Sequence, residues 1–216
     1  MQRQKMQVIY NYPPQRADAP EPLFPHLPSG ATVYVFVGQI SERKGVVVLL
    51  NAFERLLKQG RNFVLWLVGD TSWDQKDFFG MLKQRVAAAG WGERIVFFGF
   101  VKNVYLILKR SDVLVCPSLS REPLSNVVGE AKICGKPSVV FPSGGLPELI
   151  EHGVDGYVCG EKTVEALVEG IEYFASLEVR QRCGAAAWQS LEERFGLEQF
   201  RRNWAGMFVA TGSRKN

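Results

Sequence analysis

Three short apolar runs, each ending in a glycine, constrain the fold of this chain more than any other feature of its sequence. They read TVYVFVG from Thr32, FVLWLVG from Phe63 and IVFFG from Ile95. Runs of β-branched and aromatic residues without polar alternation are typical of strands that are buried on both faces. Apolar residues at helical spacing separate the first two runs, and strands that alternate with helices predict a parallel sheet. We therefore expect an α/β fold in which helices cover both faces of the sheet.

The rest of the chain continues this alternation. The helices expected from the pattern are 47–60, 76–89, 104–109 and one that begins near Ser125, and the further strands are 113–116, 138–141 and a short one near Tyr157. Residues 162–207 read as two or three amphipathic helices. About six parallel strands predict a Rossmann-like, doubly wound sheet with right-handed crossovers. In the common order 3-2-1-4-5-6, the first and fourth strands are neighbours, and ligands bind outside their carboxyl ends. The loops that face this point are 38–45 and 117–125.

The composition limits the domain organisation and the choice of partners. Residues 1–30 hold six of the 11 prolines and predict an irregular lead-in or interdomain linker, which leaves 31–210 as one folded domain. A hydrophobic content of 46% is sufficient for a buried core. The net charge of +4 is dispersed along the chain, which argues against nucleic acid as a partner but leaves an anionic membrane surface open as one.

The start of the chain and its cysteines bear on the compartment. The opening MQRQKMQ lacks the apolar segment of a signal peptide, and no apolar run is long enough to span a bilayer. The four cysteines share no C-x-x-C spacing, and Cys116 and Cys134 are expected to be buried thiols. These features predict a cytoplasmic protein that is either soluble or peripheral to the inner face of the membrane. His26 and His152 lack metal-ligand spacing, so no metal site is predicted.

The stretch 111–137 carries most of the chemistry. It contains a short apolar strand, a polar loop with Glu122, and a helix that starts near Ser125 and carries Glu130. A helix start attracts anions because its first N–H groups are unpaired and the peptide dipoles add there. Carboxylates repel phosphate, so the two glutamates are expected to accept hydrogen bonds from hydroxyl groups. A nucleotide sugar, with a diphosphate between two hydroxyl-rich rings, has the layout that suits these elements.

Each of these residues alone also has a purely structural explanation. A glutamate on a helix is usually a solvated surface charge, and Lys44 could be a surface lysine. A cation beside a helix start opposes the helix dipole, however, and such a mismatch fits an anion bound between them. Gly38 could end its strand in a turn, as we expect of Gly69, and the pair Gly144–Gly145 could be a flexible turn. The combination of two glutamates, a helix start and the switch point of the sheet favours the functional interpretation.

Five motifs in order resemble family-four retaining glycosyltransferases of the GT-B fold. They are VGQISERKG, LVGD, FFGFV, SDVLVCPSLSREPLSNVVGEAKICGKPSVV and GGLPELIEHGVDGYV. The resemblance covers about residues 32–160 and only the carboxyl-terminal, nucleotide-sugar-binding half of such enzymes, whose complete form has two Rossmann-like domains. VIYN near Val8 is similar to the sequence that closes the first, acceptor-binding domain. The resemblance implies the donor-binding half of a hexosyltransferase-type enzyme, which alone would transfer sugar weakly or not at all.

The resemblance also implies roles for individual residues. Glu122 would contact hydroxyls of the transferred sugar and Lys44 would neutralise the diphosphate, so these two are the expected catalytic residues. Glu130 would hold the nucleotide ribose. The other expected donor contacts are Gly38, Gln39, Arg43, Val101, Asn103, Ser125, Asn126, Val127, Gly144 and Gly145. No metal or other cofactor is implied, because cationic side chains and the helix start would stabilise the diphosphate.

Two positions depart from the family's pattern. Gln39 stands where the family usually has an arginine, and Arg43, next to Lys44, is a candidate substitute for the missing cation. Ser125 and Asn126 stand where a glycine followed by an apolar residue is common, and Ser125 is expected to cap the helix.

Three other functions stay open beside the glycosyltransferase interpretation. A non-catalytic nucleotide-sugar sensor or scaffold is favoured by Gln39, and a related GT-B sugar epimerase would share the pocket. An NAD-dependent Rossmann protein is weakly supported, because no G-x-G-x-x-G follows the first strand.

Aromatic residues near the carboxyl end follow helical spacing. They are Trp188, Phe195, Phe200, Trp204 and Phe208, and we expect them to pack in the core or against another domain. The family's last helix packs back on the first domain, which implies exposed apolar surface near Trp204.

Overall fold

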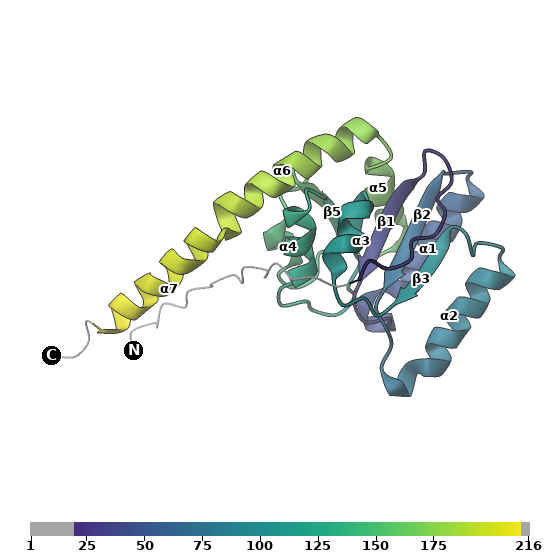
Figure 1. Cartoon of the computed structure of the whole chain (residues 1–216), viewed down its shortest axis with the longest axis horizontal. Coiled ribbons are helices and arrows are strands. Elements are labelled where there is room, and N and C mark those ends of the chain that lie inside the picture. The colour runs from purple at the N-terminus through teal and green to yellow at the C-terminus, as the bar shows by residue number, and fades with distance from the viewer. Residues whose placement is uncertain (1–19, 213–216) are drawn as a thin grey trace.

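A six-stranded parallel sheet forms the centre of the molecule (Figure 1). The structure is a computed structural model that describes residues 20–212, with side chains to residue 205 apart from that of residue 74. The strands are β1 (Thr32–Val37), β2 (Phe63–Val68), β3 (Ile95–Gly99), β4 (Val113–Cys116), β5 (Ser138–Val140) and β6 (Gly156–Val158). Their order is β3-β2-β1-β4-β5-β6, as the sequence predicts for a doubly wound sheet.

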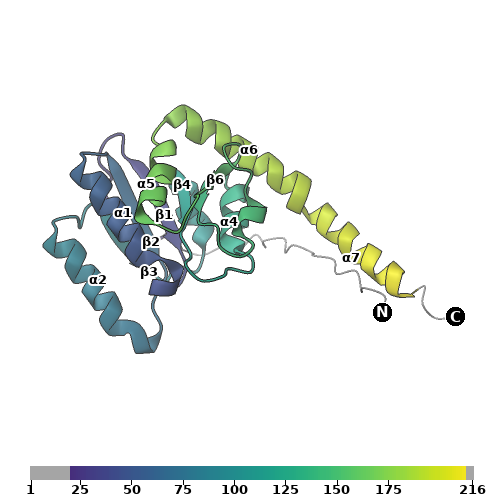
Figure 2. The same ribbon diagram turned by 180° about the vertical axis from the view of Figure 1, so that it is seen from behind.

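Helices cover both faces of this sheet (Figures 1 and 2). One face carries α1 (Val46–Lys58), α2 (Lys76–Ala88) and α5 (Val164–Tyr173), and the other carries α3 (Val104–Arg110), α4 (Asn126–Ile133) and most of α6 (Leu177–Phe195). The last helix is α7 (Leu197–Gly212), and short 3-10 turns lie at η1 (Glu42–Lys44), η2 (Trp73–Gln75) and η3 (Leu146–Leu149). The expected α/β fold with two helical layers is confirmed.

Burial on both faces explains why the strands contain so few polar residues. In β1, Tyr34 and Phe36 point into the core beneath α1 and α5, whereas Val33 and Val35 point into the core beneath α3. All four side chains are buried. Successive residues of a strand face opposite sides, so a strand covered on both faces must be apolar throughout.

The described part of the proline-rich segment packs against the sheet, which a linker would not need to do. Residues 20–30 form no helix or strand, as expected, but the Phe24 ring lies 5.5 Å from the ring of Trp66 and 6.0 Å from that of Phe98. The Arg110 guanidinium lies 4.5 Å from the Phe24 ring centroid. This segment therefore covers part of the sheet over β2 and β3. The motif VIYN near Val8 lies outside the described residues.

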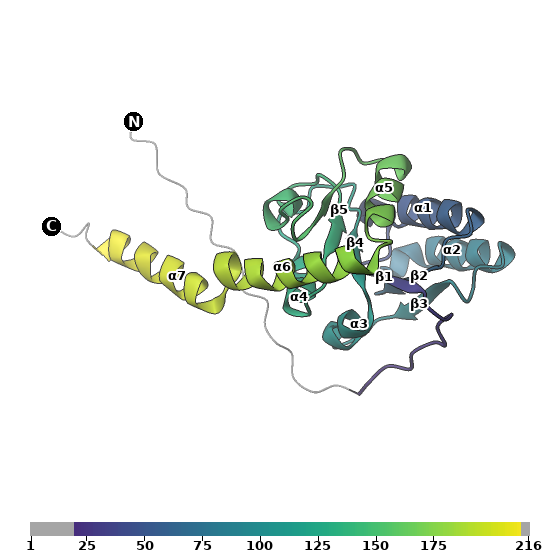
Figure 3. The same ribbon diagram turned by 90° about the horizontal axis from the view of Figure 1, so that it is seen from above.

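The helices α6 and α7 form a rod that extends beyond the sheet, and α7 projects away from the body (Figures 1 and 3). Gly196 separates the two helices, and a Cβ at this position would collide with the Glu192 carbonyl oxygen. Trp188 is 51% exposed and Trp204 38% exposed, whereas Phe195 is buried. The exposed apolar surface expected near Trp204 is confirmed, while the side chain of Phe208 lies outside the described part.

All four cysteines are free thiols. Cys116 is buried, as expected, but Cys134 at the end of α4 is only half-buried, because it lies at the C-cap rather than inside the helix. Between residues 20 and 212, no helix is both long enough and apolar enough to serve as a membrane span.

Candidate functional site

The carboxyl ends of β1 and β4 are direct neighbours. The two strands pair in parallel with Tyr34 opposite Val113 and Val35 opposite Leu114. The loops that follow them also touch, since the N–H groups of Leu119 and Ser120 donate to the Arg43 carbonyl oxygen at 3.0 and 3.2 Å. The structure thus brings together the two loops that the strand order selects.

Gly45 permits this close approach of the loops. Its φ of 76° lies in the left-handed region, and a Cβ there would collide with the Pro117 carbonyl oxygen. Only glycine meets both conditions, so Gly45 brings Lys44, the residue before it, next to the loop after β4.

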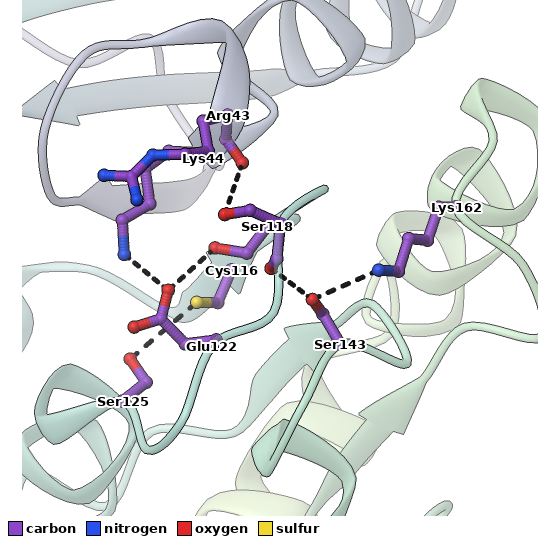
Figure 4. Close-up of polar contacts among 9 residues, drawn as sticks. Arg43, Lys44, Cys116, Ser118, Glu122, Ser125, Ser143 and Lys162 are labelled. Carbon is purple, nitrogen blue, oxygen red and sulfur yellow. Dashed lines mark hydrogen bonds and ion pairs between the residues drawn. The ribbon is translucent and has the colours of Figure 1, made fainter.

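Lys44 and Glu122 form the charged centre of the site (Figure 4). Lys44 Nζ lies 2.5 Å from Glu122 Oε2, and the Ser118 hydroxyl donates to the same oxygen at 3.2 Å. Glu122 Oε1 accepts no hydrogen bond from any residue between 20 and 212. An ammonium group has three donors, so Lys44 keeps donors for an anion while Glu122 keeps an oxygen for a hydroxyl donor. The two side chains are 25% and 15% exposed, which leaves both in reach of a ligand.

The helix α4 begins at Asn126, beside this charged pair. Ser125 occupies the N-cap position with φ −95° and ψ 108°, but its side chain makes no capping hydrogen bond. Its Oγ lies 3.8 Å from Cys116 Sγ instead, so the expectation that the Ser125 side chain caps the helix is wrong. The early N–H groups of a helix lack intrahelical partners, which leaves the amides of Asn126 and Val127 suited to an anion.

Cys116 lies beneath this helix start at the end of β4. Burial raises the pKa of its thiol to about 11, so the group is neutral under physiological conditions. Glu130 lies one turn along α4 and is 7% exposed.

The pair Gly144–Gly145 packs directly on the backbone that carries Glu122. Gly144 has a φ of +60°, and a Cβ at this position would collide with the backbone of Glu122. The Gly145 N–H donates to the Glu122 carbonyl oxygen at 2.8 Å. The two glycines therefore contact the backbone of the Glu122 loop directly and support it, in addition to the expected position in the same crevice.

An apolar pocket of about 370 Å³ lies at the carboxyl ends of β1, β2 and β3, and neither Lys44 nor Glu122 lines it. It is lined by Val37, Gly38, Gln39, Val68, Gly69, Asp70, Phe100, Val101 and Val104. The predicted site residues Gly38, Gln39 and Val101 thus share one cavity. A Cβ at Gly69 would collide with the Gly38 carbonyl oxygen, which agrees with a structural role for Gly69.

Two predicted donor contacts have other structural duties. The Asn103 side chain accepts a hydrogen bond from the Tyr105 N–H at 3.2 Å and so caps α3, and Asn103 does not line the pocket. The Arg43 carbonyl binds the loop after β4, while its exposed side chain lies near Lys44 in Figure 4.

Residue patterns did not reveal Ser118, Phe100 and Lys162. Ser118 is buried and hydrogen-bonds to Glu122, Phe100 lines the pocket, and Lys162 donates to the Leu119 carbonyl oxygen at 2.9 Å. Their positions after β4, β3 and β6 place them at the carboxyl edge of the sheet, which is the one signal that could have indicated them. Among residues 20–212, no group of three His, Cys, Asp or Glu residues could hold a metal ion.

The fold and the polar site at the switch point are those of a Rossmann-like ligand-binding domain. Comparison with known families shows which family this domain belongs to. The chain belongs to the glycosyl transferases group 1, whose family model matches residues 23–190. The chain is thus a member of this family, and its six-stranded sheet corresponds to one half of the GT-B fold.

Several curated relatives match over most of this chain. Spore coat protein SA of Bacillus subtilis is 28% identical over 184 residues, which cover 83% of this chain and 49% of that protein. The lipopolysaccharide core biosynthesis glycosyltransferase LpsD of Rhizobium meliloti is 31% identical over 171 residues, which cover 78% and 46%. The chain spans about half the length of the curated relatives it matches.

Solved structures agree with this assignment. HepE of Anabaena in complex with UDP has a TM-score of 0.74 at 26% identity, over 84% of this chain and 50% of that one. The C-terminal domain of a glycosyl transferase group 1 family protein, LpcC of Francisella tularensis, has a TM-score of 0.69 at 20% identity, over 77% and 87%. The second likeness concerns the fold alone.

Proposed function

We propose that this chain is the donor-binding domain of a retaining glycosyltransferase, which transfers a sugar from a nucleotide diphosphate sugar to an acceptor hydroxyl. The observation that carries the proposal is the pair Lys44–Glu122, which meets the start of α4 where β1 and β4 adjoin. An ammonium group and unpaired amides suit a diphosphate, and a carboxylate oxygen without a partner in the described chain suits a sugar hydroxyl. The complexes of HepE with UDP and UDP-glucose support a uridine nucleotide as the donor.

Most of the predicted residues have a role in this proposal. Lys44 and the amides of Asn126 and Val127 stabilise the diphosphate, Glu122 orients the sugar, and Glu130 binds the ribose. The pocket beside Gly38, Gln39 and Val101 is large and apolar enough to receive the base. A metal ion is not required, since the cation and the helix start already oppose the charge of the diphosphate.

The reaction needs no protein nucleophile. The bond between the anomeric carbon and the nucleotide diphosphate breaks, and the acceptor hydroxyl oxygen bonds to that carbon from the same face. Because the acceptor attacks the face from which the diphosphate leaves, the configuration is retained. The departing phosphate takes the proton of the acceptor hydroxyl, so the charges balance. Stabilisation of the leaving diphosphate by Lys44 and the amides is the main contribution of this domain.

The acceptor would bind to a separate amino-terminal domain. The chain spans about half the length of its relatives, and the exposed tryptophans of α6 and α7 offer a surface for such a partner. The isolated chain should therefore bind the donor but transfer sugar weakly. An anionic membrane surface is a further proposed partner of the complete enzyme, which would place it at the inner face of a cytoplasmic membrane.

Calorimetry with UDP, GDP and ADP tests the proposal. We expect at least one of them to bind, and we expect Glu130→Ala to weaken that binding by about tenfold through loss of the ribose contact. Glu193→Ala, an exposed position on α6, is the matched control and should change nothing. Failure of all three nucleotides to bind at millimolar concentration would refute the proposal.

A non-catalytic nucleotide-sugar sensor is the second candidate. Gln39, which lines the pocket beside Gly38, favours it because an uncharged amide cannot stabilise a leaving diphosphate as a cation does. Turnover by the chain joined to its acceptor domain, with and without Gln39→Arg, separates the two functions. A sensor would show no turnover until the arginine is introduced, whereas brisk turnover by the wild type would exclude it.

A further inference from the structure

The segment Leu119–Ser120, just before Glu122, is held on two sides (Figure 4). Its N–H groups both donate to the Arg43 carbonyl oxygen, at 3.0 and 3.2 Å. On the other side, the Leu119 carbonyl oxygen accepts a hydrogen bond from Lys162 Nζ at 2.9 Å, and the Ser120 carbonyl oxygen accepts one from the Ser143 hydroxyl. A loop without helix or strand is thus fixed through four backbone groups.

Lys162 and Ser143 act as one unit in this arrangement. Lys162 Nζ also donates to Ser143 Oγ at 3.2 Å, so a charged donor polarises the hydroxyl that binds the Ser120 carbonyl. Ser143 is fully buried, whereas Lys162 is half-buried at the carboxyl edge of the sheet, between β6 and α5. This loop belongs to no helix or strand, so its backbone carbonyl groups lack the hydrogen bonds of regular secondary structure. Lys162 and Ser143 donate those hydrogen bonds instead.

We propose that Lys162, together with Ser143, positions Glu122 against the donor sugar. The inference rests on the proposed function, because it concerns the sugar that Glu122 binds. Lys162 is a positioning residue, since its ammonium group binds the Leu119 carbonyl oxygen and Ser143 rather than Glu122 itself (Figure 4). Its effect passes through the loop backbone to a carboxylate whose other restraints are Lys44 and Ser118.

This placement predicts a selective effect on the sugar. Contacts to the diphosphate, ribose and base are assigned to Lys44, α4 and the pocket, whereas the Lys162 ammonium group hydrogen-bonds to the Leu119 carbonyl oxygen and Ser143 Oγ. Loss of the Lys162 contacts should therefore weaken the binding of a UDP-sugar and leave the binding of UDP unchanged. A protein that is merely destabilised would lose affinity for both ligands or for neither.

Calorimetry measures this difference with UDP and with whichever of UDP-glucose, UDP-galactose and UDP-N-acetylglucosamine the wild type binds most tightly. For Lys162→Met we expect about tenfold weaker binding of the UDP-sugar and UDP affinity within twofold of wild type. Lys162→Arg keeps a charged donor and should restore most of the UDP-sugar affinity. Lys58→Met, at an exposed position at the far end of α1, is the control.

A double-mutant cycle with Glu122→Ala decides whether Lys162 acts through Glu122. In the Glu122→Ala background, Lys162→Met should have no further effect on the UDP-sugar. Three outcomes would overturn the inference: equal losses of affinity for UDP and the UDP-sugar, no loss for either ligand, or additive effects in the cycle. In each of these cases, nucleotide binding by the wild type would still uphold the proposed function. A wild type that binds neither UDP nor any UDP-sugar of the panel would overturn both.

Discussion

Glu122 is restrained through both its side chain and its backbone. Oε2 receives Lys44 and Ser118, and the carbonyl oxygen receives the Gly145 N–H. A carboxylate held in this way loses little conformational freedom when a ligand arrives, which lowers the cost of binding. The same restraints make the site sensitive to small changes beneath it.

Gly144→Ala should disturb this support. The new Cβ would meet the Glu122 backbone in addition to the strain of a φ of +60°, and the left-handed conformation alone costs about 1–2 kcal/mol. Gly60→Ala is the control, because Gly60 has a φ of +78° but no atom within 4 Å of its Cβ position. We expect both variants to lose stability in urea denaturation and only Gly144→Ala to lose UDP-sugar affinity. Equal affinities for the two variants would contradict the support role.

The thiol of Cys116 gives a prediction about pH. Its pKa in the folded protein is raised by burial to about 11 from a usual value near 9, so between these values the folded state holds a proton that the unfolded state has lost. Stability from this group is therefore fully present below pH 9 and is lost as the pH rises through 11. The stability difference between wild type and Cys116→Ala should shrink by about 2 kcal/mol between pH 8 and pH 11. Denaturation at both pH values measures it, and a constant difference would show that the thiol titrates normally.

The helix α4 is anchored by a buried charged network as well as by its apolar face. Lys132 Nζ lies 2.5 Å from Asp155 Oδ2 and 2.6 Å from Ser190 Oγ, and the Ser190 hydroxyl donates to the same carboxylate oxygen at 2.7 Å. Both charged side chains are buried, at 1% and 0% exposure. Burial lowers the pKa of Lys132, an effect that its hydrogen bond with Asp155 opposes. The network ties α4 to the loop before β6 and to α6.

Removing one partner of this network should be costly. Lys132→Met leaves the Asp155 charge buried without its counter-ion, and we expect a loss of about 3–5 kcal/mol in the free energy of unfolding. Asp155→Asn keeps an acceptor for the Glu151 N–H, so adding it to Lys132→Met should recover part of the loss. Urea denaturation of the two single variants and the double variant measures the coupling. Strictly additive losses would mean that the two charges do not depend on each other.

The sheet could be predicted from the sequence because its strands carry their own signal. The runs at Thr32, Phe63 and Ile95 are apolar on both faces, and only a doubly covered strand needs that pattern. The order of strands then selected the two loops of the site. The general position of Lys44 and Glu122 followed from topology rather than from either residue alone.

The contacts that fix the loops could not be read from local patterns. Lys162 contacts Leu119, which lies 43 residues earlier in the chain. Phe24 belongs to the irregular segment before β1, yet it packs on Trp66 in β2. Such pairs depend on how irregular backbone folds in three dimensions, which has no periodicity. The Ser125 side chain likewise turns to Cys116 rather than to the helix, although serine favours the cap in general.

The exposed residues of α6 and α7 bear on the proposal that a separate domain binds the acceptor. Trp188 and Trp204 are exposed on the rod, and exposed aromatic residues are frequent anchors of interfaces. Trp204→Glu should weaken association with a separately produced acceptor domain by about tenfold or more, while UDP affinity is unchanged. Sedimentation of the mixed domains measures this, with Met81→Glu, at an exposed position on α2, as the control. Equal association of both variants would place the interface elsewhere.

A crystal structure of the chain with UDP is the most direct test of where the nucleotide binds. The diphosphate should lie within hydrogen-bond distance of Lys44 Nζ and of the amide nitrogens of Asn126 and Val127, with the uracil in the pocket beside Val101 and Phe100. Density for UDP away from the junction of β1 and β4, or phosphates that touch neither Lys44 nor the start of α4, would contradict the assignment of this site.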